Sequence, residues 1–229
     1  MCGRFTLRTP LSVLAKQFEF DLDAAIGDVR PRYNIAPTQT VLGVRQIEQG
    51  ASRELAQLFW GQVPSWVKDQ KGAYACINAR SDTVATKPTF RSAFKKRRCL
   101  VLADGYYEWR KEGKIKQPYF FEVDGGQPFA FAGLWEWWRE PGKDDGPSLE
   151  SCCLLTGEPN ELQSQVHDRM PMILDPAHYD AWLDPANEDR DNLLRMLTPF
   201  AADRMTMRPV STYVNNARNE GDACIVAQL

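Results

Sequence analysis

The sequence predicts an α+β fold in which antiparallel strands form a curved or barrel-like sheet core and short helices flank it. Short apolar or alternating runs recur along the chain between glycine, proline and aspartate turn signals, which is typical of antiparallel strands. Segments with helical periodicity are few and short. The 229 residues, 43% of them hydrophobic, are enough for one large core, so we expect a single domain over residues 1–229.

The first sixty residues predict a helix, a rigid segment and a strand pair. Thr9-Pro10 is a helix-start signal, and apolar residues follow it at helical spacing. Pro31 and Pro37 bracket an extended segment that cannot freely join the centre of a sheet, so we expect it to line the surface. Strands are expected at 41–46 and 54–60, paired across a glycine turn.

The middle of the chain predicts a buried strand followed by a hairpin. Residues 99–103 are continuously apolar, Asp104-Gly105 turns the chain, and the hairpin closes at Glu112-Gly113. Glu108 lies between aromatic neighbours on this hairpin. Such surroundings desolvate a carboxylate and favour its neutral form, which suits acid–base catalysis. The alternative is an exposed edge-strand glutamate paired with a basic neighbour.

The last hundred residues predict strands and short helices around a polar loop that holds His167. A loop histidine followed by an aspartate and an arginine is better placed for proton transfer than a core histidine. His178 lies in a helix that Asp175-Pro176 begins, and we expect it to be structural. The segment 139–148 is expected to be a surface loop. Strands are expected at 118–123, 129–135, 152–156 and 205–210, and a further helix at 190–197.

Cys2 follows the initiator methionine, and removal of that methionine would leave an α-amine and a thiol on one terminal residue. Both groups titrate close to neutral pH, with usual pKa values of about 8 and about 8.5. With an aldehyde, the amine can form a Schiff base and the thiol can then add to the same carbon, which closes a five-membered thiazolidine. Taken alone, a cysteine at position 2 is more often an ordinary residue of a frayed terminus.

Two further segments carry candidate binding residues. Asn78 offers both a hydrogen-bond donor and an acceptor, and Arg80 would face the same side of a strand two residues later. The alternative for this pair is ordinary strand-end chemistry. Trp66, in the loop after strand 54–60, could stack on a base, although a half-buried core tryptophan fits the pattern as well.

Charge and cysteine usage limit the function classes. The net charge of −2 argues against a general duplex-DNA binder, yet six basic residues and no acidic one lie between Asp82 and Asp104. This run predicts either a groove that follows phosphates or a solvated face. The six cysteines have neither disulfide nor zinc spacing, and we expect no metal and no cofactor. Without a signal-peptide or membrane-span pattern, we expect a cytoplasmic protein with no membrane partner.

Five separated motifs stand out along the chain. They are Met1-Cys2-Gly3-Arg4-Phe5, Arg32-Tyr33-Asn34-Ile35-Ala36-Pro37, Ile77-Asn78-Ala79-Arg80, Asp104-Gly105-Tyr106-Tyr107-Glu108-Trp109 and His167-Asp168-Arg169-Met170-Pro171. In this order they resemble the motifs of the SRAP family of SOS-response-associated proteins, and the chain is similar to a bacterial member. The resemblance runs from the first residue to nearly the last. It implies the SRAP fold and a protein that crosslinks to abasic sites in single-stranded DNA.

The resemblance assigns roles position by position. It implies Cys2 as the crosslinking nucleophile, with Asn78, Glu108 and His167 as its active-site companions. The implied DNA-binding residues are Arg4, Arg80, Trp109 and Arg169, to which we add Trp66 and Pro37. Family members often have two consecutive tryptophans after the position of Pro64, whereas this chain has Trp66 followed by Val67, so one stacking platform of the family pattern is missing.

The expected function is a thiazolidine crosslink between Cys2 and the ring-opened abasic sugar, which shields the lesion from strand cleavage. Lyase-like activity and autoproteolytic removal of Met1 are expected beside it. The expected partners are abasic single-stranded DNA and the replication machinery, and we expect a nucleoid-associated monomer. Three alternatives stay open: a glutamine amidotransferase, a cysteine peptidase built from Cys2, His167 and Asn78, and a non-catalytic single-strand binding module.

Overall fold

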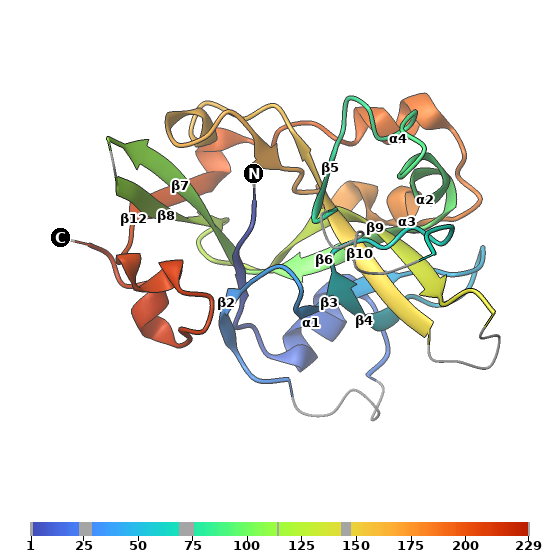
Figure 1. Cartoon of the computed structure of the whole chain (residues 1–229), viewed down its shortest axis with the longest axis horizontal. Coiled ribbons are helices and arrows are strands. Elements are labelled where there is room, and N and C mark those ends of the chain that lie inside the picture. The colour runs from blue at the N-terminus through green and yellow to red at the C-terminus, as the bar shows by residue number, and fades with distance from the viewer. Residues whose placement is uncertain (1, 23–28, 69–75, 114, 143–147, 229) are drawn as a thin grey trace.

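A closed barrel of five strands lies at the centre of the molecule (Figure 1). The computed structural model describes the chain except for residues 1, 23–28, 69–75, 114, 143–147 and 229. The barrel strands are β3 (Thr40–Arg45), β4 (Glu54–Trp60), β6 (Arg98–Ala103), β9 (Phe129–Arg139) and β10 (Ser148–Gly157). Their order is β10-β4-β3-β6-β9, and β9 pairs back with β10, so the ring leaves no free edge over the paired residues.

A second sheet packs against the barrel. It has the order β12-β8-β7-β1-β2, and every neighbouring pair is antiparallel. Its strands are β1 (Phe5–Leu7), β2 (Arg32–Ile35), β7 (Gly105–Glu112), β8 (Ile115–Val123) and β12 (Met205–Pro209). Phe5 joins the two layers, because its ring centroid lies 5.1 Å from that of Trp60 and 5.7 Å from that of Phe131, both barrel residues. Sheet and barrel therefore share one core.

Short elements complete the fold around these strands. Two short strands, β5 (Asn78–Arg80) and β11 (Met170–Pro171), pair with β10. The α-helices are α1 (Leu11–Phe18), α2 (Arg91–Lys96), α3 (Tyr179–Leu183) and α4 (Arg190–Arg195). The 3-10 turns are η3 (Gln163–Gln165), η4 (Pro176–His178), η5 (Ala202–Arg204), η6 (Thr212–Asn215) and η7 (Asp222–Cys224). No helix among these described elements is long and apolar enough to cross a membrane.

The carboxylate of Asp104 ties the start of the chain to the start of β7. It accepts hydrogen bonds from the hydroxyl of Thr6 at 2.6 Å and from the backbone N–H of Thr9 at 2.8 Å, and its Oδ1 lies 3.0 Å from Nε of Arg8. Asp104 is 1% exposed, so these bonds form where water cannot replace them. They hold β1 beside β7 in the register that pairs Phe5 with Tyr106.

The expected architecture is confirmed. The helix after Thr9-Pro10, the strand pair β3 and β4, the buried strand β6 and the hairpin of β7 and β8 form where the sequence predicts them. Two strand pairings are parallel and not antiparallel as expected: β10 with β4, and β10 with β5. The expected surface loop 139–148 includes residues 143–147, which lie outside the described residues.

The last four residues of the basic run, which ends at Arg98, contact other parts of the fold. Arg98 is 1% exposed. Its guanidinium donates to five backbone carbonyls, those of Phe94, Lys95, Trp182, Asp184 and Asn187. Burial lowers the pKa of Arg98 to about 10. Arg97 pairs with Glu136, while Lys95 and Lys96 pair with Glu188, so this part of the run serves the fold.

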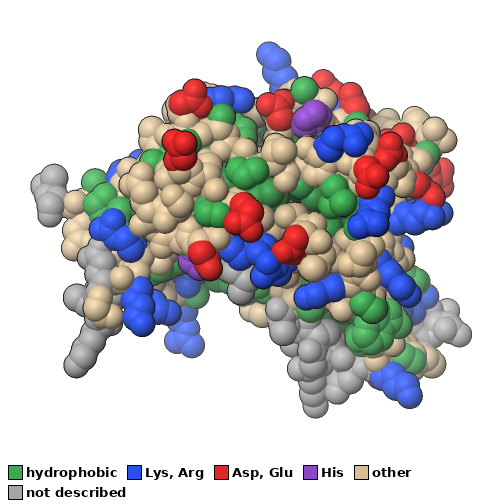
Figure 2. Space-filling view, turned by 90° about the horizontal axis from the view of Figure 1, so that it is seen from above, with side chains coloured by type: hydrophobic (Ala, Val, Ile, Leu, Met, Phe, Trp, Pro, Cys, Tyr) green, Lys and Arg blue, Asp and Glu red, His purple; other side chains and the backbone are tan. Residues whose placement is uncertain are grey.

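Acidic side chains accompany the basic ones elsewhere on the surface too. Figure 2 shows Lys and Arg intermingled with Asp and Glu over the visible face. No field of a single sign therefore covers this face.

Replacement of Gly105 tests the β1–β7 junction. An added Cβ would lie 2.2 Å from Cζ of Phe120 and 2.9 Å from Oγ1 of Thr6. We expect Gly105→Ala to lower the free energy of unfolding by about 1–3 kcal/mol, because a packed core resists insertion of a methyl group. Urea denaturation would measure the change, and a variant as stable as the wild type would contradict the tight approach.

Candidate functional site

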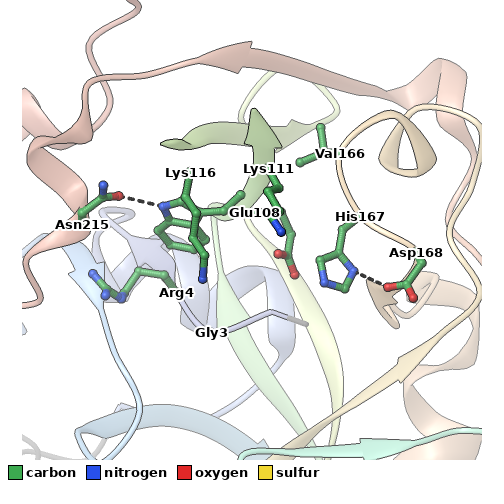
Figure 3. Close-up of a pocket in the computed structure, with 10 residues that line it drawn as sticks. Gly3, Arg4, Glu108, Lys111, Lys116, Val166, His167, Asp168 and Asn215 are labelled. Carbon is green, nitrogen blue, oxygen red and sulfur yellow. Dashed lines mark hydrogen bonds and ion pairs between the residues drawn. The ribbon is translucent and has the colours of Figure 1, made fainter. Parts of the chain in front are cut away.

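A cavity of about 760 Å³ opens where the start of the chain meets β7 (Figure 3). Three parts of the molecule besides the N-terminal segment form its walls: the β7–β8 hairpin, the turn after η3, and η6. The lining residues are Gly3, Arg4, Glu108, Trp109, Lys111, Lys116, Val166, His167, Asp168 and Asn215.

Cys2 lies beneath this cavity. The backbone N–H of Tyr107 donates to the carbonyl of Arg4 at 2.9 Å, which continues the β1–β7 pairing toward residue 2. Nδ2 of Asn78, the first residue of β5, donates to the carbonyl of Cys2 at 2.9 Å. The side chain of Cys2 is fully buried. Burial raises the pKa of its thiol far above the usual value, and the nearby charge of Glu108 raises it further, so the thiol is protonated at neutral pH.

Glu108 and Tyr106 project from the same face of β7, as the period of two requires. Glu108 is 2% exposed and yet lines the cavity, so its carboxylate lies at the boundary between the core and the opening. Burial raises the pKa of the Tyr106 hydroxyl, and the charges of Cys2 and Glu108 add to this rise. These electrostatic effects mean that the three side chains lie close together in a medium that water screens weakly.

His167 occupies the opposite wall, on the turn that follows η3. Its Nδ1 accepts a hydrogen bond from the backbone N–H of Arg169 at 3.1 Å and lies 2.8 Å from a carboxylate oxygen of Asp168. A ring that accepts the first bond carries its proton on Nε2. A ring that donates from Nδ1 to Asp168 is either an imidazolium or the neutral tautomer whose Nε2 bears no proton. Figure 3 shows the ring between Glu108 and Asp168.

Gln163 positions this turn. The backbone carbonyl of Gln163 accepts a hydrogen bond from the backbone N–H of His167 at 3.0 Å, and its side-chain Nε2 donates to the backbone carbonyl of Arg169 at 3.1 Å. Its Oε1 accepts the hydroxyl of Tyr106 at 2.9 Å. Gln163 is fully buried, so one side chain links the His167 turn to the residue that neighbours Cys2 and Glu108.

The C-terminal part of the chain fixes the wall around Arg4 and Trp109. Nη1 of Arg4 donates to Oδ1 of Asn34 at 2.6 Å and to the carbonyl of Val214 at 2.8 Å. The Arg4 guanidinium lies 5.7 Å from the centre of the Trp109 ring, and Nε1 of Trp109 donates to Oδ1 of Asn215 at 2.7 Å. The hydrogen bond to Asn215 of η6 therefore fixes the orientation of the Trp109 ring.

Comparison with known proteins identifies the family. The family model described as SOS response associated peptidase (SRAP) matches residues 1–217. The chain belongs to the SRAP family. It is 40% identical to the abasic site processing protein YoqW of Bacillus subtilis, over 98% of this chain and 99% of that one. It is 33% identical to the abasic site processing protein HMCES of Gallus gallus, over 87% of this chain and 67% of that one.

A solved structure supports the same fold. A protein from Bacteroides thetaiotaomicron superposes on this SRAP chain with a TM-score of 0.87 and 25% sequence identity, and the match covers 100% of both chains. The family resemblance carried by the five sequence motifs is therefore confirmed.

The predicted DNA-binding residues occupy different places around this SRAP site. Arg4 and Trp109 line the cavity, whereas Arg80, Arg169, Trp66 and Pro37 are not among the described residues that line it. Arg80 pairs with Asp82 at 2.6 Å, and Nη2 of Arg169 donates to the hydroxyl of Thr156 at 2.9 Å. Burial, and next the charge of Arg80, lower the pKa of Arg169, so these two cations lie near each other. The side chain of Trp66 is 66% exposed.

Sequence reasoning missed several residues that shape the site. Asp168 lies within a motif already singled out, and its neighbour His167 was the signal that could have revealed it. Gln163 and Asn215 carry no local signal, because their contacts are to residues distant in the chain. Lys116 pairs with Lys111 on the same hairpin, and the hairpin pattern could have revealed it. No group of three or more His, Cys, Asp or Glu side chains is arranged to hold a metal ion within the described part of the chain.

Substitution of Gln163 tests its positioning role. Gln163→Leu leaves the Tyr106 hydroxyl and the Arg169 carbonyl without these partners, and each buried polar group left unpaired costs about 1–3 kcal/mol. We expect faster hydrogen exchange in the segment 164–170 and a lower melting temperature. Ser164→Ala, an exposed change on the same turn, is the control and should alter neither. Unchanged hydrogen exchange in Gln163→Leu would show that the conformation of segment 164–170 does not depend on the Gln163 side chain.

Proposed function

We propose that this SRAP chain acts on abasic sites in single-stranded DNA and that Cys2, after removal of residue 1, forms a thiazolidine with the opened sugar. The names of the relatives, which describe abasic site processing, support the substrate class. The observation that carries the chemistry is the position of residue 2. Asn78 holds its carbonyl beside a cavity that Glu108 and His167 line, where an amine, a carboxylate and an imidazole can act on one carbon.

Opening of the sugar requires an acid. An abasic deoxyribose is mainly a closed hemiacetal, and its ring oxygen must gain a proton as the C1′ aldehyde forms. His167 lines the cavity beside Glu108, and an imidazole can give a proton near neutral pH, which supports this residue as the donor.

The amine then attacks the aldehyde. A bond forms between the nitrogen of Cys2 and C1′, the resulting carbinolamine loses one water, and an imine remains. Glu108 can take a proton from the attacking amine and return one to the departing hydroxyl, so one carboxylate serves both steps. Asn78 orients the residue through the hydrogen bond to its carbonyl.

The thiol completes the ring. A bond forms between Sγ and C1′ as the C=N double bond becomes single, and the thiol proton passes to the nitrogen. Because burial keeps this thiol protonated, it does not compete with the amine for the free aldehyde. Saturation of the imine removes the electron-withdrawing group that promotes β-elimination, so the strand is shielded from cleavage.

The raised thiol pKa also bears on the alternative hydrolase functions. A cysteine peptidase needs a thiolate, which a lowered pKa supplies. Here burial and Glu108 raise the pKa of Cys2, which weighs against a peptidase.

Replacement of Cys2 separates these functions. Intact-protein mass spectrometry after mixing with abasic single-stranded DNA should show a covalent adduct for the mature wild type and no stable adduct for Cys2→Ala. Cys2→Ser keeps the amine without the thiol, so we expect a labile adduct and more strand scission. A stable adduct of full yield in Cys2→Ala would overturn the aminothiol mechanism, and DNA binding alone by the wild type would favour a non-catalytic module.

Glu108→Gln tests proton transfer. The amide keeps the shape of the side chain but cannot exchange protons, and we expect adduct formation to slow by about 100-fold or more, as is typical of general acid–base groups. Affinity for an uncrosslinkable abasic analogue should be unchanged. Rate and affinity would be measured separately, and a loss of affinity at an unchanged rate would make Glu108 a binding residue.

A further inference from the structure

We propose that Lys111 and Lys116, which face each other across the β7–β8 hairpin, contact the phosphates on one side of the abasic sugar and so decide on which side of the lesion the strand must continue. The inference rests on the proposed function and adds a substrate requirement to it. Neither lysine belongs to the five motifs that carry the family resemblance.

The register of the β7–β8 hairpin places two lysines opposite each other. Lys111 and Lys116 are direct cross-strand partners, and both are exposed. Like charges placed directly opposite on a ladder destabilise it. Neither ammonium group has an ion-pair partner among the described residues, so no described carboxylate offsets the repulsion between the two positive charges. An anion bound between the two lysines would turn this repulsion into attraction.

Both lysines also belong to the wall of the cavity. They line it together with Glu108 and Trp109, and Figure 3 shows their side chains extending from the hairpin toward the cavity. Lys111 follows Glu108 by three residues on the same strand, so their Cα atoms are about 10 Å apart at the usual rise of a strand. By the period of two their side chains leave opposite faces of β7, yet both line the cavity, so Lys111 can contact a group beside the one that Glu108 contacts.

Two walls of the cavity carry charges of opposite sign. The wall opposite the hairpin carries Asp168, whose side chain is 89% exposed. A phosphate is attracted toward the lysines and repelled from this carboxylate. Trp109 lies between Glu108 and the lysines along β7, where its ring can stack on the base of the adjoining nucleotide. The strand on the hairpin side of the lesion is thus held more firmly than the strand on the other side.

A different role for the lysines makes a different prediction. Beyond Tyr107, β7 has no hydrogen-bonded partner on the β1 side among the described residues, and a lysine such as Lys111 on an open edge discourages aggregation. That role needs positive charge but no DNA. It predicts altered solubility and an unchanged dependence of DNA affinity on salt.

The test compares two double variants. The first is Lys111→Gln with Lys116→Gln. The second, the matched control, is Lys95→Gln with Lys96→Gln on α2, where both lysines pair with Glu188. The probes are single-stranded oligonucleotides with a tetrahydrofuran abasic analogue, which cannot crosslink, flanked by nucleotides on both sides, only the 5′ side or only the 3′ side. Affinity is measured at several salt concentrations.

We expect the wild type to bind one of the one-sided probes more tightly than the other. In the hairpin variant this preference should be lost, and the slope of log affinity against log salt should fall by about 0.7 for each lysine removed. The α2 variant should behave as the wild type. An unchanged slope and preference in the hairpin variant would overturn the inference.

A second readout separates this inference from the proposed function. Adduct formation with free 2-deoxyribose, which has no phosphate, should be equal in the wild type and the hairpin variant, because Cys2, Glu108 and His167 are intact. If the wild type forms adducts but the hairpin variant keeps the wild-type slope of log affinity against log salt, only the role of the two lysines is refuted. A wild type that forms no adduct with abasic DNA, yet shows lysine-dependent binding, refutes only the crosslink.

Discussion

The buried carboxylate of Asp104 is the constraint on which the site depends. Its bonds to Thr6, Arg8 and Thr9 fix β1 against β7, and this pairing determines that residue 2 comes to lie near residue 108. The two segments are about a hundred residues apart in sequence, so no local preference could bring them together. The barrel supplies the support, because Phe5 is anchored among barrel aromatic rings.

Burial explains the chemistry that the site favours. Cys2 and Glu108 are almost inaccessible to water, and each charge in such a place is costly unless it is compensated. The Cys2 thiol is therefore protonated in the structure. In the proposed reaction this favours nitrogen as the first atom to attack the aldehyde, with sulfur adding afterwards to the imine.

Local sequence patterns predicted the parts of the structure that depend on local forces. The apolar run of β6, the hairpin ending near Gly113 and the helix after Pro10 all follow from periodicity and turn chemistry. The position of Glu108 beside aromatic residues was also visible in the sequence. The residues of the family motifs could be named, but their distances and partners could not.

Long-range contacts limited what the sequence could predict. The basic run ending at Arg98 indicated a surface, yet the carbonyls that bury this guanidinium come in part from residues 182–187. Gln163 and Asn215 contact partners that are 57 and 106 positions away. A polar residue in a loop has the same appearance in the sequence whether it faces solvent or joins such a network, because its partner is defined only by the fold.

The links from Arg4 and Asn34 to the carbonyls of Val214 and Asn219 have a consequence for biosynthesis. Translation makes residues 2–4 about two hundred positions before the segment that secures the wall beside them. A nascent chain interrupted before residue 214 therefore lacks the carbonyls that hold Arg4 and Asn34, so the wall of the cavity is completed only after that segment has been made.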